Sequence, residues 1–161
     1  MFDYSLNEIK KELKEKSHEE LLAQCLLLAK YKKDNKEYLG YLLFDQSDKQ
    51  NFAQEVLKNI DLQLEEIKDQ KHWYLIKKSW RKILRHMSKC AKFSKSKELE
   101  IQMAIHFVQR VQASDVPYYA FNALSNIIEL QFKKIRTIIP TLHEDLQHDY
   151  KKELIKLLEH S

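Results

Sequence analysis

Apolar side chains recur at steps of three and four residues along most of this chain, and polar side chains fill the positions between them. This spacing is the period of an amphipathic α-helix, because residues three and four apart lie on one face. The clearest run is Phe52, Val56, Ile60, Leu64 and Ile67. Breaks in the pattern separate seven or eight expected helices, over residues 5–16, 17–31, 34–44, 47–69, 71–92, 97–112, 115–138 and 141–157.

Residues that can cap a helix stand at the start of several of these segments. In a capping box, the side chain of a serine or threonine accepts a hydrogen bond from the backbone N–H of the residue three positions later. The side chain of that later residue accepts a hydrogen bond from the backbone N–H of the serine or threonine. Asp34 is expected to cap the third helix, and Pro117 fits the first turn of the seventh. Four capping boxes are predicted: Ser5 with Glu8, Ser17 with Glu20, Ser47 with Gln50, and Thr141 with Glu144.

The third segment is the most crowded with apolar residues. Those at positions 38, 39 and 41–44 cannot share one narrow face, so we expect this helix to be deeply buried. A glycine inside a helix costs up to about 1 kcal/mol relative to alanine. We therefore expect Gly40 to admit the close approach of another helix.

Glycine and proline are scarce, and this scarcity decides the fold class. The 161 residues include one glycine and two prolines, the residues that dominate hairpins and positive-φ turns. The sequence predicts a single all-α domain over residues 1–161. Short connections favour antiparallel neighbours, so either an irregular antiparallel helical bundle or a short stack of α-hairpins is expected.

The same scarcity excludes several chemistries. Phosphate-binding loops and the nucleophile elbow of α/β-hydrolases need several glycines close together. His143 and His148 flank Glu144, but they lie five residues apart instead of the four that zincins require. His106, in an apolar run, is expected to be a core or boundary histidine. We expect no cofactor, no metal site and no catalytic residue.

No apolar run approaches the roughly 18 residues that span a bilayer, so no membrane span is expected. The first residues lack the apolar centre of a signal peptide, which favours a cytoplasmic location. Cys25 and Cys90 lie in apolar helical contexts without a CxxC pattern and are expected to be buried thiols.

Three stretches resemble a known group of sequences. They are LLLAKYKKDNKEYLGYLLF (26–44), KKSWRKILRHMSKCAKFSKSKE (77–98) and TLHEDLQHDYKKEL (141–154). They are similar to a family of small, uncharacterised, all-helical bacterial proteins, over most of the chain. The resemblance implies a bacterial cytoplasmic origin, and it transfers no catalytic residue because that family has no assigned activity.

The charge distribution is uneven. Residues 71–97 contain ten Lys or Arg and no Asp or Glu, whereas residues 1–70 carry a formal charge of −4 and residues 98–161 carry −2. In a helix, most of these cations fall within about a 100° arc that includes Tyr74, with Trp73, Trp80 and Met87 expected to be buried. The basic stripe, as we call this candidate binding surface, consists of Lys71, Tyr74, Lys78, Arg81, Lys82, Arg85, Lys89 and Lys92.

Three interpretations of the basic stripe stay open. It can be an ordinary solvated face, or one whose charge is compensated by the upstream carboxylates Asp61, Glu65, Glu66 and Asp69. It can contact a protein partner, or it can bind nucleic acid or another polyanion. No recognised nucleic-acid motif accompanies it.

The sequence favours a non-catalytic helical interaction or scaffold protein, which binds a protein partner or forms a homodimer. Aromatic residues anchor many interfaces, and the candidate anchors are Tyr38, Tyr41, Phe44, Tyr118 and Tyr119. Polyanion or nucleic-acid binding through residues 71–97 is the alternative. An enzyme with a helical active site is less favoured, because the sequence shows no nucleophile, base and orienting group, although residues distant in sequence can still come together in the fold.

Overall fold

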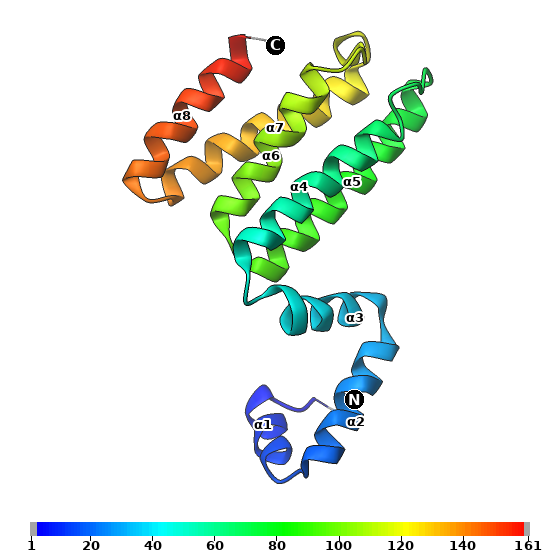
Figure 1. The fold of residues 1–161 in the computed structure, drawn as a ribbon, viewed down its shortest axis with the longest axis vertical. Coiled ribbons are helices and arrows are strands. Elements are labelled where there is room, and N and C mark those ends of the chain that lie inside the picture. Colours follow the sequence, from blue (N-terminus) through cyan, green and yellow to red (C-terminus); the bar gives the residue numbers. More distant parts are fainter. Residues whose placement is uncertain (1–2, 160–161) are drawn as a thin grey trace. The chain divides into compact units, whose positions relative to one another are not determined.

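The computed structural model describes residues 3–159, and within them the chain forms eight α-helices and no strand (Figure 1). The all-α prediction is therefore confirmed. A π-helical turn at Tyr41–Asp45 (η1) and 3-10 turns at Tyr118–Ala120 (η2) and Ile139–Thr141 (η3) complete the regular structure. The α-helices are α1 (Leu6–Lys14), α2 (His18–Tyr31), α3 (Lys33–Gly40), α4 (Lys49–Glu65), α5 (Trp73–Ser94), α6 (Lys97–Gln112), α7 (Asn122–Ile138) and α8 (Glu144–Glu159).

The helices belong to two compact units. The N-terminal unit covers Met1–Ser47 and includes α1 to α3, and the C-terminal unit covers Asp48–Ser161 and includes α4 to α8. Each unit has its own internal packing. The expectation of one domain over residues 1–161 stays a prediction.

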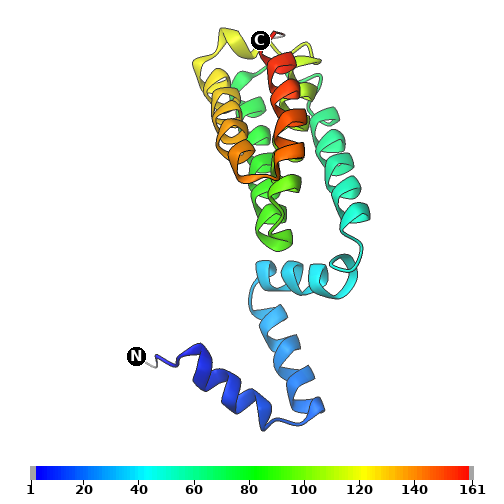
Figure 2. The ribbon, with the colours of Figure 1, turned by 90° about the vertical axis from the view of Figure 1, so that its left-hand side faces the viewer.

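Helix α6 is the centre of the C-terminal unit and contacts α4, α5, α7 and α8 (Figures 1 and 2). Because neighbours cover it on several sides, its buried residues are not confined to one narrow stripe, as a helix inside a bundle requires. They are Leu99, Ile101, Met103, Ala104, Ile105, Phe107, Val108 and Val111.

The contact between α5 and α6 contains the largest buried side chain. The indole of Trp80 meets the ring of Phe107 edge to face, with the ring centroids 5.6 Å apart. Trp80 and Met87 are buried, as expected. The expectation for Trp73 is wrong, because this residue begins α5 at the border of the unit and is 39% exposed.

Local capping explains some of the helix starts. The capping boxes of Ser5 with Glu8 and of Ser17 with Glu20 are both present, and they begin α1 and α2. At the start of α3 no side chain caps the helix, so the role expected for Asp34 is wrong.

Two other predicted capping boxes are wrong. The carboxylate of Asp48, and not the hydroxyl of Ser47, accepts the N–H of Asn51 at 2.9 Å and begins α4. The hydroxyl of Thr141 donates to the carbonyl oxygen of Ile138 at 2.7 Å, because Thr141 ends a 3-10 turn instead of starting a helix.

The segment around Pro117 also differs from the expectation. Pro117 precedes the short turn η2, and α7 begins only at Asn122. The hydroxyl of Ser125 donates to the carbonyl oxygen of Tyr118 at 3.0 Å and thus ties this turn to α7. The seventh helix is therefore shorter than predicted.

In the N-terminal unit, α2 packs on α3, and α3 continues into η1. None of α1, α2 and α3 contains a buried residue, and Tyr41 of η1 is the buried member of its segment. The deep burial expected for residues 34–44 is therefore wrong. The packing interpretation of Gly40 is wrong as well, since apart from the adjacent residues and the nearby backbone of its own helix, no described atom lies within 4 Å of the place where a β-carbon would stand.

The turn between α5 and α6 supplies a stability prediction. Lys95 ends α5 in the left-handed conformation, with φ of 52° and ψ of 23°. Glycine adopts this conformation without the steric cost of a β-carbon, which is about 1 kcal/mol. Lys95→Gly is expected to raise the free energy of unfolding of the C-terminal unit by about 1 kcal/mol in urea denaturation. The control Lys92→Gly, in the last turn of the helix itself, should lower it, and a loss in both variants would contradict the prediction.

A second prediction concerns pH. The carboxylate of Glu100 on α6 binds Lys97 at 2.9 Å and Lys134 of α7 at 3.0 Å. Burial opposes ionisation, but these two hydrogen bonds outweigh it and hold the pKa of Glu100 below its ordinary value of 4.5. A lowered folded-state pKa stabilises the fold above the unfolded-state pKa, and this contribution is lost as the pH falls through the folded-state pKa.

Glu100→Gln is therefore expected to destabilise the C-terminal unit by about 1 kcal/mol at pH 7, and to lose less stability than wild type between pH 5 and pH 3. Urea denaturation at several pH values measures both effects. Glu129→Gln, at an exposed position of α7, is the control. Equal acid sensitivity of Glu100→Gln and wild type would contradict the assignment.

Candidate functional site

Helix α5 carries most of the basic stripe on its outward face. Lys78, Arg81, Lys82, Arg85 and Lys92 are exposed, whereas Lys89 is half-buried. Tyr74 is exposed among them. Lys71 lies two residues before α5, so its predicted position on the helical arc is wrong. The stripe thus starts at Tyr74 and follows the helix to its last turn.

Compensation by the upstream carboxylates was one of the interpretations left open, and two of these carboxylates pair with other cations. The carboxylate of Asp61 is hydrogen-bonded to the ring of His106 at 2.7 Å and forms an ion pair with Arg110 at 2.9 Å, while Glu65 pairs with Lys68. The pKa of Lys68 is raised mainly by Glu65 and, to a smaller extent, by the negative charge of Asp69.

The cations of the stripe remain largely unneutralised. Among residues 3–159, the following stripe residues form no ion pair with a carboxylate: Lys71, Lys78, Arg81, Lys82, Arg85 and Lys92. The open positive face is therefore favoured over the compensated one.

A shallow depression of about 230 Å³ lies on this face. Its lining comes from α5 alone and consists of Tyr74, Lys77, Lys78, Arg81 and Arg85. We call it the α5 depression. It brings together four of the stripe's cationic or aromatic residues and adds Lys77, which lies about 40° outside the predicted helical arc.

Aromatic rings support one end of the α5 depression. Trp73 stacks on Phe121 with the centroids 6.0 Å apart, and Tyr74 meets Trp73 edge to face at 6.1 Å. The ammonium group of Lys77 lies 5.8 Å from the Trp73 ring centroid. The ring of Tyr74 is thus supported at one edge by Trp73 and remains largely accessible to solvent.

The second candidate surface is the apolar exterior of the N-terminal unit. Thirteen large apolar side chains are exposed there: Tyr4, Leu6, Ile9, Leu13, Leu22, Leu26, Leu27, Leu28, Tyr31, Tyr38, Leu42, Leu43 and Phe44. A hollow of about 550 Å³ lies among them, with Tyr4, Ile9 and Leu13 on one side and Gln24 of α2 on the other. We call these thirteen side chains the N-terminal apolar surface.

The predicted aromatic anchors divide between exposed and covered positions. Phe44, Tyr38 and Tyr119 are exposed, Tyr118 is half-buried, and Tyr41 is buried. Tyr41 stacks on Tyr38 with the centroids 6.4 Å apart. Phe44 and Tyr38 thus belong to the N-terminal apolar surface. Cys25 is also exposed, so its expected burial is wrong, whereas Cys90 is buried as expected.

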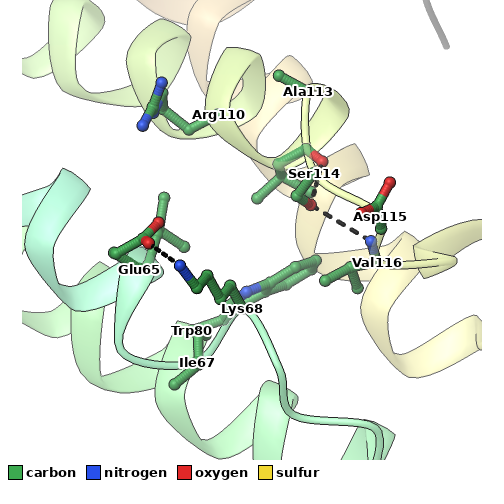
Figure 3. A pocket seen from close by; sticks show the side chains of 11 residues that line it. Glu65, Ile67, Lys68, Trp80, Arg110, Ala113, Ser114, Asp115 and Val116 are labelled. Carbon is green, nitrogen blue, oxygen red and sulfur yellow. Dashed lines mark hydrogen bonds and ion pairs between the residues drawn. The ribbon is translucent and has the colours of Figure 1, made fainter.

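A hollow of about 210 Å³ separates the end of α4 from the end of α6 (Figure 3). Glu65 and Lys68 form one wall, and Arg110 and Ser114 stand on the other. The hydroxyl of Ser114 donates to the carbonyl oxygen of Val111 at 2.6 Å and accepts the N–H of Val116. Both bonds close the turn after α6, so this serine has a structural explanation.

Helix α6 also contains a contact that the sequence did not reveal. His106 lies 45 positions after its partner Asp61, and it is half-buried at the seam of α4 and α6. The boundary position agrees with the expectation. Its acidic partner could not be identified, because nothing in a single sequence pairs two residues so far apart.

A metal site in the part of the chain that is described would require a cluster of potential ligands. There, no three residues of the types His, Cys, Asp and Glu are arranged to hold a metal ion. His143 precedes the helix in which Glu144 and His148 lie, and its ring is 3.4 Å from the carboxylate of Asp145.

A membrane-spanning helix was not expected, and none of the helices within residues 3–159 is both long and apolar enough to cross a bilayer.

Comparison with known proteins yields no relative: no family model, no curated protein and no solved structure matches this chain. The resemblance to small all-helical bacterial proteins stays a prediction. The two surfaces must therefore be interpreted from their own chemistry.

Proposed function

We propose that this protein is a non-catalytic interaction protein that associates with a second copy of itself through its N-terminal unit. The observation that carries the proposal is the N-terminal apolar surface: nine of its thirteen large side chains lie on α1, α2 and α3, which contain no buried residue. Large apolar side chains left exposed in such number are characteristic of interaction sites.

Helix α2 provides the strongest argument. Leu26, Leu27 and Leu28 are consecutive and all exposed, and their side chains point about 100° apart around the helix. A helix that is apolar on all sides is normally surrounded by other elements. One neighbouring helix such as α3 cannot cover all three leucines, which supports a further partner on the remaining sides.

The charge of the N-terminal unit supports a second copy as that partner. Residues 1–47 hold eight basic and nine acidic side chains, so two such units would meet without strong repulsion. Closed two-fold dimers are also the most common soluble oligomers. A strongly acidic or basic protein would gain little from so balanced a surface.

The energetics are compatible with stable association. Burying one large apolar side chain contributes about 1.5–3 kcal/mol, and joining two chains costs an estimated 4–15 kcal/mol, so about ten of these side chains offset even the highest cost at the lowest contribution. The thirteen available exceed that requirement.

Light scattering coupled to size-exclusion chromatography tests the proposal. The expected mass is twice the monomer mass of 19.4 kDa, with dissociation on dilution. A species of 19.4 kDa at every concentration into the millimolar range would overturn self-association, whether the surface is then covered by the C-terminal unit or by a different protein.

The remaining interpretations have less support. A helical active site has less support, because the cysteine–histidine contact of α5, Cys90 Sγ to His86 Nε2 at 3.7 Å, has its thiol buried in the core of the C-terminal unit. The cytoplasmic location and the bacterial origin stay predictions. Binding of a polyanion by the basic stripe is supported by separate observations on α5.

A further inference from the structure

We propose that α5 binds single-stranded nucleic acid, with Lys78, Arg81 and Arg85 contacting phosphates and Tyr74 stacking on a base. The inference concerns the C-terminal unit alone and does not rest on self-association. It follows from three features that coincide in the α5 depression: open positive charge, a supported aromatic ring and an apolar face that is already buried.

The positive charge is concentrated and rigidly held. Lys78, Arg81 and Arg85 follow one another at steps of three and four residues, so a cation recurs about every 5.4 Å turn along one face. All three are exposed and form no ion pair with a described carboxylate. Phosphates can therefore approach without first displacing an internal partner.

The ring of Tyr74 supplies what a purely cationic surface lacks. It is 63% exposed, and it lies in the same depression as the three cations. Its edge contact with Trp73, which stacks on Phe121, limits the conformations of the segment. Nonspecific single-strand binders combine a cationic track with accessible aromatic rings, because every base offers a face for stacking.

The packing of α5 argues against a lipid surface as the ligand. A helix that lies on a membrane inserts a broad apolar face between the headgroups. The apolar face of α5 is already buried in the core of the unit through Ile76, Trp80, Ile83, Met87 and Cys90. On the outward face of α5, only the cations and the ring of Tyr74 remain available to a ligand. A flexible polyanion that contains aromatic bases fits this combination better than a lipid surface does.

Fluorescence anisotropy with a labelled oligothymidylate tests the inference on the full chain. If three phosphates are neutralised, log affinity should fall against log salt with a slope of about −2. Replacing Lys78, Arg81 and Arg85 together with glutamate is expected to weaken binding by at least about 100-fold at low salt and to flatten the slope. Circular dichroism verifies that the variant remains helical.

A matched variant distinguishes the site from overall charge. Lys133, Lys151 and Lys152 are exposed on α7 and α8, and replacing all three with glutamate changes the net charge equally. This control should retain binding within a few-fold of wild type. An equal loss in both triple variants would overturn the site and leave only a general effect of net charge.

The stacking step has its own test. Tyr74→Ala is expected to weaken binding of the oligonucleotide by about tenfold, and Tyr74→Phe to preserve it. The control is Tyr119→Ala, at a tyrosine that is 78% exposed in the same unit. Heparin, a polyanion without bases, should bind Tyr74→Ala as well as wild type.

Three outcomes would overturn the proposal. The first is oligonucleotide binding that is unaffected by Tyr74→Ala and equalled by heparin, which would assign the surface to any polyanion. The second is binding to phosphatidylserine vesicles without binding to the oligonucleotide. The third is the absence of oligonucleotide binding at low salt.

Discussion

The double substitution Leu27→Lys and Tyr31→Lys is expected to convert the associated protein into a monomer. Both side chains lie on α2 one turn apart, and both are exposed within their unit. In a symmetric dimer the double variant removes four apolar side chains, each contributing about 1.5–3 kcal/mol when buried. Losing even part of this binding free energy is expected to raise the dissociation constant of the dimer at least about 100-fold. Analytical ultracentrifugation over a dilution series measures the change.

The matched control is Leu62→Lys with Leu130→Lys in the C-terminal unit. Leu27 is 66% exposed, and Leu62 and Leu130 are 56% and 60% exposed, so the substitutions cost similar amounts in the isolated chain. The control is expected to keep the wild-type dissociation constant. If the control dissociates the protein and the α2 variant does not, the interface does not include α2.

Truncation of Trp80 is expected to have the largest effect on the stability of the C-terminal unit. Trp80→Ala would leave a cavity beside Phe107 in a position that is 1% exposed. Removing a buried tryptophan costs about 3–5 kcal/mol, out of the 5–15 kcal/mol that typically stabilise a domain. Urea denaturation followed by circular dichroism should show either a large shift of the midpoint or a unit that is unfolded without urea.

Trp73→Ala is the control for this prediction, because the same residue type stands seven positions earlier on the same helix. It is expected to cost about 1 kcal/mol, since much of its indole surface is already in contact with water. Equal losses in the two variants would show that the assignment of core and border positions on α5 is wrong.

Helix capping shows where local reasoning reaches its limit. Ser5 with Glu8 and Ser17 with Glu20 were predictable, because every bond of a capping box lies within four residues. Before α4, two adjacent residues can both cap, and only the observed backbone shows that Asp48 does so instead of Ser47. The position of such a start depends on how the preceding segment enters the helix.

The sequence was sufficient to predict where the basic stripe lies on α5. It was not sufficient to predict whether neighbouring carboxylates neutralise the stripe. Its arc followed from the helical period, and the exposure of Lys78, Arg81 and Arg85 agrees with it. Whether neighbouring acids neutralise it depended on contacts over long distances in sequence. Asp61, one of the expected compensating groups, is instead held by His106 and Arg110 of α6.

Local sequence was enough to predict the all-α class, a count of seven or eight helices and most of the basic face of α5. These properties depend on period, on local caps and on the lack of glycine and proline, all of which act within a few residues. Only the tertiary structure decided which apolar positions are covered. Leu26 to Leu28 and the centre of α6 are similarly apolar in sequence, yet the former are exposed and the latter is buried. Burial depends on the neighbours that surround a helix, and the helix's own residues do not specify them.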